Sequence, residues 1–103
     1  MAREKYILVK HFCDQTHIEI SFVENLHEYG LVSFEEKEND IFIDEKDVSE
    51  IEKWFRLHHD LGINFEGLDA ISQMLKRLSR AEKELAKLQN RLNLYEWNFK
   101  KNA

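Results

Sequence analysis

Apolar and polar residues alternate in short blocks at the start of the chain, and their spacing indicates several short elements. The run KYILV at 5–9 is rich in β-branched and aromatic residues, which favour a strand. The following run, KHFCDQT at 10–16, is long enough for one or two helical turns. We expect His17 to lie in a turn that Ile18 anchors to the core. These residues therefore predict a strand, a short helix and a turn.

A second helix is predicted at 20–28, where the sequence ISFVENLHE places its bulky apolar residues at helical spacing. Gly30 follows and can end this helix, because glycine adopts positive φ at little cost. The start of the helix is less typical, since Glu19 is a poorer N-cap than Ser, Thr, Asp or Asn. We therefore expect Ser21, rather than Glu19, to set its first turn.

Two further apolar runs predict a β-hairpin after this helix. LVSF at 31–34 and IFI at 41–43 are strand candidates, and the polar segment EEKEND lies between them. We expect EEKEND to form the tip of the hairpin. A hairpin that follows a helix-turn-helix pair in this way is a wing.

A third helix is predicted from about 45 to 60. Asp44 is a good N-cap for it, and acidic residues in the first turn favour the positive end of a helix dipole. The apolar face of this helix contains Val48, Ile51, Phe55 and His58, with Trp54, Leu57 and Leu61 alongside. Gly62 is expected to end it, and Trp54 is expected to be buried.

The last helix should begin at an Asn64 cap and reach about residue 99. Its apolar positions change phase at Leu78, where two consecutive spacings of three residues meet. From there they follow a regular alternation of three and four, which is typical of a coiled coil. The predicted dimerisation residues are Leu78, Ala81, Leu85, Leu88, Leu92 and Tyr95, and Phe99 continues the pattern. The alternative is a kinked helix that folds back on its own domain.

Length and composition predict one small domain with a helical extension, divided at 1–63 and 64–103. The chain has 103 residues, of which 43% are hydrophobic, enough for a core but only a thin one, so a partner copy would help. Cys13 is the single cysteine, which favours a reducing compartment. The start contains no predicted cleavage site, and the longest purely apolar run is four residues. We expect a cytoplasmic protein without a membrane span.

The negative charge is concentrated in one region. The formal net charge is −5, but residues 11–52 carry thirteen acidic and two basic residues, a net of −11. Residues 53–103 carry ten basic and six acidic residues, a net of +4. An acidic surface favours a basic partner and disfavours a phosphate backbone. Within 19–43, Lys37 is the single basic residue against seven acidic ones.

No pattern of catalytic or metal-binding residues is evident. The chain contains no G-x-S-x-G, no H-E-x-x-H and no glycine-rich phosphate loop. His58, His59 and Asp60 are adjacent on a predicted helix, so their side chains diverge by about 100° and form a poor chelate. Cys13 is expected to be a core residue, because a reactive thiol needs basic neighbours. We expect no enzyme, no metal and no cofactor.

The order of predicted elements, a helix-turn-helix pair, a wing, a helix and a long final helix, resembles MerR-like winged helix-turn-helix domains. The junction EYGLVSF at 28–34 is similar to the end of the second helix and the start of the wing in that class. A closer resemblance is to the CbpM family of bacterial chaperone modulators. It rests on HFC at 11–13, EYGLV at 28–32, IFIDEKDV at 41–48 and, most specifically, FRLHHDLGINFEGLDAISQML at 55–75. The resemblance covers about residues 7 to 95, and His17 departs from it by replacing a usual turn glycine.

The resemblance implies a mostly α fold, with a small β-hairpin wing and a long C-terminal coiled-coil helix. It also implies a homodimer that binds the J-domain of a co-chaperone called curved-DNA-binding protein A and inhibits that co-chaperone. J-domains present a basic helix face, which complements the acidic region 11–52. The expected partner-binding residues are Glu24, Glu28, Tyr29, Leu31, Phe34, Glu35, Glu36, Glu38 and Asp40. Core packing beneath the hairpin is an equally good interpretation of the three apolar residues in this set, and a solvated face is the alternative for the acidic ones.

Two other functions remain open at this stage. One is a MerR-like transcription factor, which the fold analogy supports but the charge of 19–43 disfavours, since DNA binders of this type neutralise roughly 6–10 phosphates. The other is a purely structural dimerisation module, which would need only the coiled coil and a solubilising charge. We do not expect a nucleic acid partner.

Overall fold

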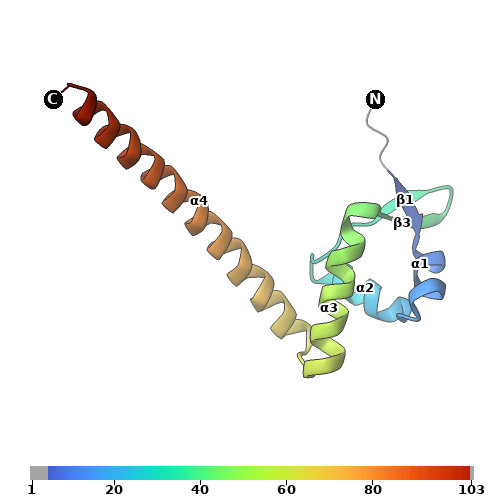
Figure 1. Ribbon diagram of the computed structural model, residues 1–103. Coiled ribbons are helices and arrows are strands. Elements are labelled where there is room, and N and C mark those ends of the chain that lie inside the picture. Colours follow the sequence, from blue (N-terminus) through green and yellow to red (C-terminus); the bar gives the residue numbers. More distant parts are fainter. Residues whose placement is uncertain (1–4, 103) are drawn as a thin grey trace. The chain divides into compact units, whose positions relative to one another are not determined.

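The computed structural model describes residues 5–102. The elements are β1 (Tyr6–Leu8), α1 (Val9–Thr16), α2 (Ile20–Glu28), β2 (Glu35–Lys37), β3 (Asp40–Asp44), a 3-10 turn (Glu45–Asp47), α3 (Val48–Leu61) and α4 (Phe65–Asn102) (Figure 1). They divide into two compact units. The first, here called the body, ends at Ala70, and the second, here called the arm, begins at Ile71.

The turn between α1 and α2 forms as predicted, and His17 occupies a backbone conformation that usually needs glycine. Its φ is +62° and its amide donates to the Cys13 carbonyl at 2.9 Å. The Thr16 hydroxyl accepts a weak hydrogen bond from the Ile18 amide at 3.4 Å, and Ile18 is buried. Left-handed backbone is strained for residues with a Cβ, so these contacts hold the turn that glycine would form without strain.

The start of α2 differs from the prediction for Ser21. The helix begins at Ile20 with Glu19 in the N-cap position, and no side chain caps it. The Ser21 hydroxyl donates to the Glu19 carboxylate at 3.3 Å instead of accepting from a backbone amide. The Glu19 carbonyl accepts from the amides of Phe22 and Val23. Backbone hydrogen bonds therefore set the first turn.

The three strands form one antiparallel sheet in the order β1-β3-β2. Ile7 pairs with Ile43 in the register of β1 and β3, and Glu36 pairs with Ile41 in the register of β2 and β3. The predicted strand at 41–43 is therefore the central strand. The hairpin turns at Glu38 and Asn39, both with positive φ, as two-residue hairpin turns require.

The predicted strand at 31–34 is wrong, and the strand of the wing is Glu35–Lys37 within the segment expected to be the tip. The end of α2 gives the reason. Gly30 has φ +74°, its amide donates to His27, and the Leu31 amide donates to Leu26 at 2.9 Å. This is a Schellman cap, which uses the backbone of Leu31 to satisfy the end of the helix.

The start of α3 also differs from the prediction. The Asp44 side chain does act as a cap and accepts from the Lys46 amide at 2.9 Å, but it caps the short 3-10 turn that precedes the helix. The α-helix itself begins at Val48 rather than at residue 45 and ends at Leu61, before Gly62 with φ +68°. Ile51 and Trp54 are its buried residues, which confirms the prediction for Trp54.

The core lies where the sheet, α1, α2 and α3 meet. The buried apolar residues are Val9, Phe12, Cys13, Ile18, Phe22, Val23, Leu26, Val32, Ile43, Ile51, Trp54 and Leu68. An aromatic cluster joins three helices of the body: the Phe22 ring lies 5.4 Å from Phe55 and 5.5 Å from Phe65, and His58 lies 5.0 Å from Phe65. The body is thus the predicted winged helix-turn-helix domain.

The first turn of α4 belongs to this core. The Asn64 side-chain oxygen accepts from the Gly67 amide at 2.8 Å, which confirms the predicted cap. Leu68, one turn further on, is fully buried. The helix then continues without interruption to Asn102, a few residues beyond the predicted end. None of the helices within 5–102 combines the length and the apolar character needed to cross a bilayer.

Candidate functional site

The acidic residues of the wing lie on two different faces of the sheet. Side chains alternate along a strand, so residues paired across two strands share a face. Ile41 lies on the same face of the sheet as the buried Ile43, which faces the helices. Glu36 pairs with Ile41, so Glu36 also lies on the face towards the helices. Glu35 pairs with Phe42 on the opposite face. The sheet register thus separates two neighbouring carboxylates that the sequence had grouped.

Lys37 and Asp40 share the outer face with Glu35. They are paired across the hairpin, and the Lys37 ammonium lies 5.4 Å from the centre of the Tyr6 ring. The single basic residue of 19–43 is thereby held on the face away from α2. Glu38 lies at the exposed hairpin turn and faces neither side of the sheet. Among the predicted carboxylates of the wing, the register turns Glu36 towards α2, while Asp40 at the start of β3 also lines the space between α2 and the wing.

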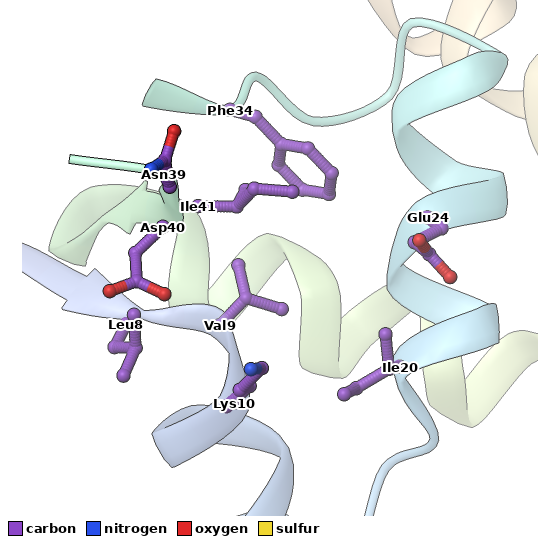
Figure 2. Close-up of a pocket in the computed structure, with 9 residues that line it drawn as sticks. All are labelled: Leu8, Val9, Lys10, Ile20, Glu24, Phe34, Asn39, Asp40 and Ile41. Carbon is purple, nitrogen blue, oxygen red and sulfur yellow. The ribbon is translucent and has the colours of Figure 1, made fainter. Parts of the chain in front are cut away.

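Two hollows that share lining residues lie between α2 and the wing, and together they are here called the α2–wing groove. The first, of about 180 Å³, is largely apolar and is lined by Leu8, Val9, Lys10, Ile20, Glu24, Phe34, Asn39, Asp40 and Ile41. The second, of about 430 Å³, is lined by Glu24, His27, Glu28, Phe34, Glu36 and Ile41. Glu24, Phe34 and Ile41 line both. Figure 2 shows Phe34 and Ile41 pointing towards α2, whereas Asp40 points away from them.

The apolar wall of the groove is held in place by ring stacking. The Phe34 ring is stacked on His27 with centroids 4.2 Å apart and an angle of 3° between the planes. Phe34 is half-buried, so it packs on α2 while part of its ring remains accessible. Val9 forms a buried floor, and Ile20 is 40% exposed at the edge. Phe34 is therefore neither a core residue nor a free surface residue.

One wall of the groove is acidic along α2. Ile20, Glu24 and Glu28 follow each other at intervals of four residues, which places them on one face of the helix. Glu36 lies across from them on the wing and lines the same hollow. Among residues 5–102, no ion pair involves Glu24, Glu28 or Glu36. The groove thus carries carboxylates on both walls at one end and apolar side chains at the other.

Tyr29 and Leu31 lie outside this groove. The Tyr29 hydroxyl donates to the Glu66 carboxylate at 2.7 Å, and its ring stacks on Phe65 at 5.8 Å. This hydrogen bond raises the pKa of Tyr29 and lowers the pKa of Glu66. Leu31 is half-buried behind the Schellman cap. Tyr29 connects α2 to the first turn of α4, whereas the Leu31 amide belongs to the end of α2, and neither residue lines the groove with Glu24 and Glu36.

Sequence reasoning missed seven residues of the groove: Leu8, Val9, Lys10, Ile20, His27, Asn39 and Ile41. Ile20 carried a usable signal, because it is an apolar residue of α2 outside the buried set of Phe22, Val23 and Leu26. The position of Ile41 depends on the strand register, which the sequence did not provide. His27 becomes notable only through its contact with Phe34.

The structure shows the surroundings of Cys13, His58 and His59, the residues considered above for catalysis or metal binding. Burial raises the pKa of the Cys13 thiol, and the carboxylates of Asp14 and Glu24 raise it further, so a thiolate is disfavoured. His58 Nδ1 contacts the Ile63 carbonyl at 2.8 Å, while His59 Nδ1 contacts Asp60 at 3.0 Å. These two histidines therefore have separate partners. The part of the chain described here contains no group of three or more His, Cys, Asp or Glu residues placed to hold a metal ion.

The arm presents the second predicted site. Its apolar stripe is exposed in the single chain, with Leu85 63% and Leu88 59% accessible. Leu94 and Trp97 are also exposed but lie outside the stripe, and Lys101 lies 4.8 Å from the centre of the Trp97 ring. The exposed stripe is an apolar surface of the kind that pairs with another helix.

The chain was compared with models of known families. The model of the MerR HTH family of regulatory proteins matches residues 7–90, which include the whole helix-turn-helix pair, the wing, α3 and much of α4. A comparison with curated proteins found no match.

Proposed function

Because the chain belongs to the MerR HTH family of regulatory proteins, we propose that it is a non-enzymatic member that regulates through protein contacts, as a CbpM-like chaperone modulator. In this proposal it binds the basic helix face of a J-domain co-chaperone and inhibits that co-chaperone. The binding surface is the α2–wing groove with its acidic walls. The arm pairs with a second copy, so the active form is a homodimer.

The reversal of charge at the surface that DNA-binding relatives use carries this proposal. Residues 19–43 hold seven acidic residues and one basic residue, and the ammonium of that Lys37 lies over Tyr6 on the outer face of the wing. DNA binders of this type neutralise roughly 6–10 phosphates with Lys and Arg. A dimer of this chain would bring two such lysines. A cationic protein fits the surface better than a phosphate backbone does.

Inhibition would follow from occupancy. A J-domain uses its basic helix face to reach its chaperone ATPase, and the resemblance to CbpM indicates that the modulator covers this face. Opposite potentials steer the encounter and disfavour acidic partners, while the apolar part of the groove supplies contacts that salt does not screen. The proposal therefore needs both components of the groove.

A DNA-binding regulator is the second candidate, and the regulatory description of the matched family favours it. It predicts a sequence-specific complex with duplex DNA that survives moderate salt. A purely structural dimerisation module is the third, and it predicts a dimer that binds neither DNA nor a J-domain. The three functions therefore differ in what the full chain retains from a defined set of ligands.

Calorimetric titration of the full chain with an isolated J-domain fragment tests the proposal. We expect one J-domain per chain at low salt and an affinity that weakens by at least about tenfold between roughly 50 and 200 mM salt, because exposed charges are screened over that range. A duplex DNA library serves as the competing ligand. Absence of any J-domain complex at low salt would exclude the modulator, and selection of one duplex sequence would establish the DNA-binding alternative.

A further inference from the structure

We propose that the α2–wing groove is polarised and selects a cationic helix by its spacing: one aliphatic side chain enters the apolar hollow, and Lys or Arg residues one and two turns further along face the acidic end. This inference deepens the proposed function by naming the residue pattern that the partner must carry. The observation behind it is that apolar and acidic side chains are segregated along the groove.

The apolar end has room for a single side chain. Its hollow measures about 180 Å³, somewhat larger than the ~150 Å³ cavities that accommodate a benzene molecule in protein cores. Val9 closes the floor, Phe34 and Ile41 form a wall, and the His27 ring is stacked on Phe34. Ile20 is accessible at the edge and can cover an inserted side chain. A concave apolar site of this size fits one branched aliphatic group.

The acidic end begins one helical turn away. Glu24 lies at the boundary of the two hollows, and Glu28 lies a further turn along α2, a rise of about 6 Å at the helical ~1.5 Å per residue. Glu36 faces them from the wing. Three carboxylates without an ion pair among the described residues therefore surround the second hollow. Two cations spaced by one helical turn would match them.

The charge of the two linings sets the direction. Lys10 lines the first hollow together with Asp40 and Glu24, whereas three carboxylates and no Lys or Arg line the second, so a cation is attracted more strongly on the Glu28 side of the anchor. The favoured ligand thus has its basic residues on one side of the aliphatic anchor only. On a helix this pattern is an aliphatic residue at position i and Lys or Arg at i+4 and i+8, which lie on one face.

The other available occupant is the arm of a second copy, since it is basic and carries exposed leucines. In the arm these leucines lie in one continuous stripe from Leu78 to Phe99. Insertion into the groove would use one leucine and leave the others exposed. Charge and shape therefore favour a partner helix with a single anchor, and the self-association state of groove variants separates the two occupants.

Two neighbouring residues of β2 provide a matched pair of variants. Glu36→Lys and Glu35→Lys change the net charge equally, but only Glu36 faces the groove. The probe is an alanine-based helical peptide with one Leu at i and Lys at i+4 and i+8, and the control peptide has the same composition with the lysines moved to i+2 and i+6. Binding is measured by fluorescence anisotropy of the labelled peptides, and then with a J-domain fragment.

We expect Glu36→Lys to weaken binding of the first peptide at least about tenfold at low salt, and Glu35→Lys by less than about threefold, the part due to general charge steering. Ile20→Ala should weaken binding about fivefold at every salt concentration, because it removes apolar contact rather than charge. Leu61→Ala, an equally aliphatic exposed position away from the groove, should have no effect. The control peptide should bind at least about fivefold more weakly than the first.

The outcomes separate the inference from the proposed function. Equal effects of Glu35→Lys and Glu36→Lys, or equal binding of the two peptides, overturn the groove model even if the J-domain binds. If the first peptide binds in the expected pattern but no J-domain complex forms, the groove model is supported and the J-domain is excluded as the partner. Failure of both ligands overturns both ideas. Loss of dimerisation in Ile20→Ala or Glu36→Lys would assign the groove to a second copy instead.

Discussion

The body buries its large apolar side chains, whereas the arm exposes them. Every apolar residue that is buried in the described chain lies at or before Leu68, while the exposed large hydrophobic residues of the arm include six leucines, Tyr95, Trp97 and Phe99. Charge differs in the same way, since residues 11–52 are strongly acidic and residues 71–102 carry eight basic and three acidic side chains. The arm therefore has an exposed apolar and basic surface, whereas the body has an acidic surface.

This difference shows which interactions each region requires. The body satisfies its hydrophobic residues internally, so its surface is free to be specialised for charge. An isolated helix in water gains most of its stability from packing an apolar face, and the arm has no such partner in its own unit. We therefore expect dimerisation to depend on the arm and recognition to depend on the body, and variants in one region should leave the function of the other intact.

The largest effect is expected in the core of the body. Ile51 is fully buried on α3, so Ile51→Ala should lower the free energy of unfolding by about 2–5 kcal/mol. Urea unfolding followed by circular dichroism measures the change. Ile20→Ala is the matched control, because Ile20 is 40% exposed and should cost less than about 1 kcal/mol. Equal losses would show that the body does not have the core described here.

The next largest effect separates the arm from the body. Leu85→Glu places a charge in the apolar stripe and should weaken self-association at least about tenfold, because a buried unpaired carboxylate is costly. Leu94→Glu introduces the same charge at an equally exposed leucine outside the stripe and should leave the dimer intact. Sedimentation equilibrium distinguishes the chain mass of 12.4 kDa from twice that value. A dimeric Leu85→Glu variant would mean that another surface pairs the chains.

A smaller effect is expected where the body passes into α4. Asn64→Ala removes the side-chain oxygen that accepts from the Gly67 amide and should cost about 1 kcal/mol of stability, as N-cap losses typically do. Asn64→Asp keeps an acceptor and should stay close to the parent protein. Thermal unfolding of the three proteins measures the difference. If Asp were as destabilising as Ala, the cap would contribute nothing.

The smallest effect is expected from the hydrogen bond between Tyr29 and Glu66. This bond lowers the pKa of Glu66, so its contribution is present above the ordinary glutamate pKa of about 4.3 and is lost as the pH falls through the lowered value. It raises the pKa of Tyr29, so the contribution is also lost as the pH rises through that raised value. Glu66 is exposed and Tyr29 is half-buried, so solvent weakens the bond and Tyr29→Phe should reduce the melting temperature only slightly at neutral pH. The difference should vanish in acid, and a constant difference at all pH values would point to lost ring packing instead.

Local sequence signals predicted most of the fold because they act within a few residues. Gly30, Gly62 and Asn64 end or begin helices through their own backbone or side-chain hydrogen bonds, and each does so in the structure. The central strand at 41–43 follows from its apolar composition. β2 could not be predicted in this way. Its sequence, EEK, has little preference for a strand and pairs only because β3 and the Glu38–Asn39 turn align it.

The groove was predictable only in part, since it depends on register and packing. A shift of one residue in the pairing of β2 would turn Glu35 instead of Glu36 towards α2. The acidic character of this region was evident from the sequence, and the structure places Glu24, Glu28, Phe34 and Glu36 around one hollow. The segregation into an apolar end and an acidic end appeared only when Ile20 and Ile41 were placed. The roles of these residues in binding remain predictions.

A single competition titration tests the central claim that this acidic winged domain recognises a cationic protein surface. A labelled J-domain fragment is bound to the full chain at low salt and challenged separately with unlabelled J-domain and with an excess of mixed-sequence duplex DNA. We predict that the unlabelled J-domain displaces the labelled J-domain completely and that DNA does not displace it by binding to the chain. The Glu36→Lys variant should bind the labelled J-domain at least about tenfold more weakly. A chain that ignores the J-domain and instead forms a tight complex with one duplex sequence would contradict the account.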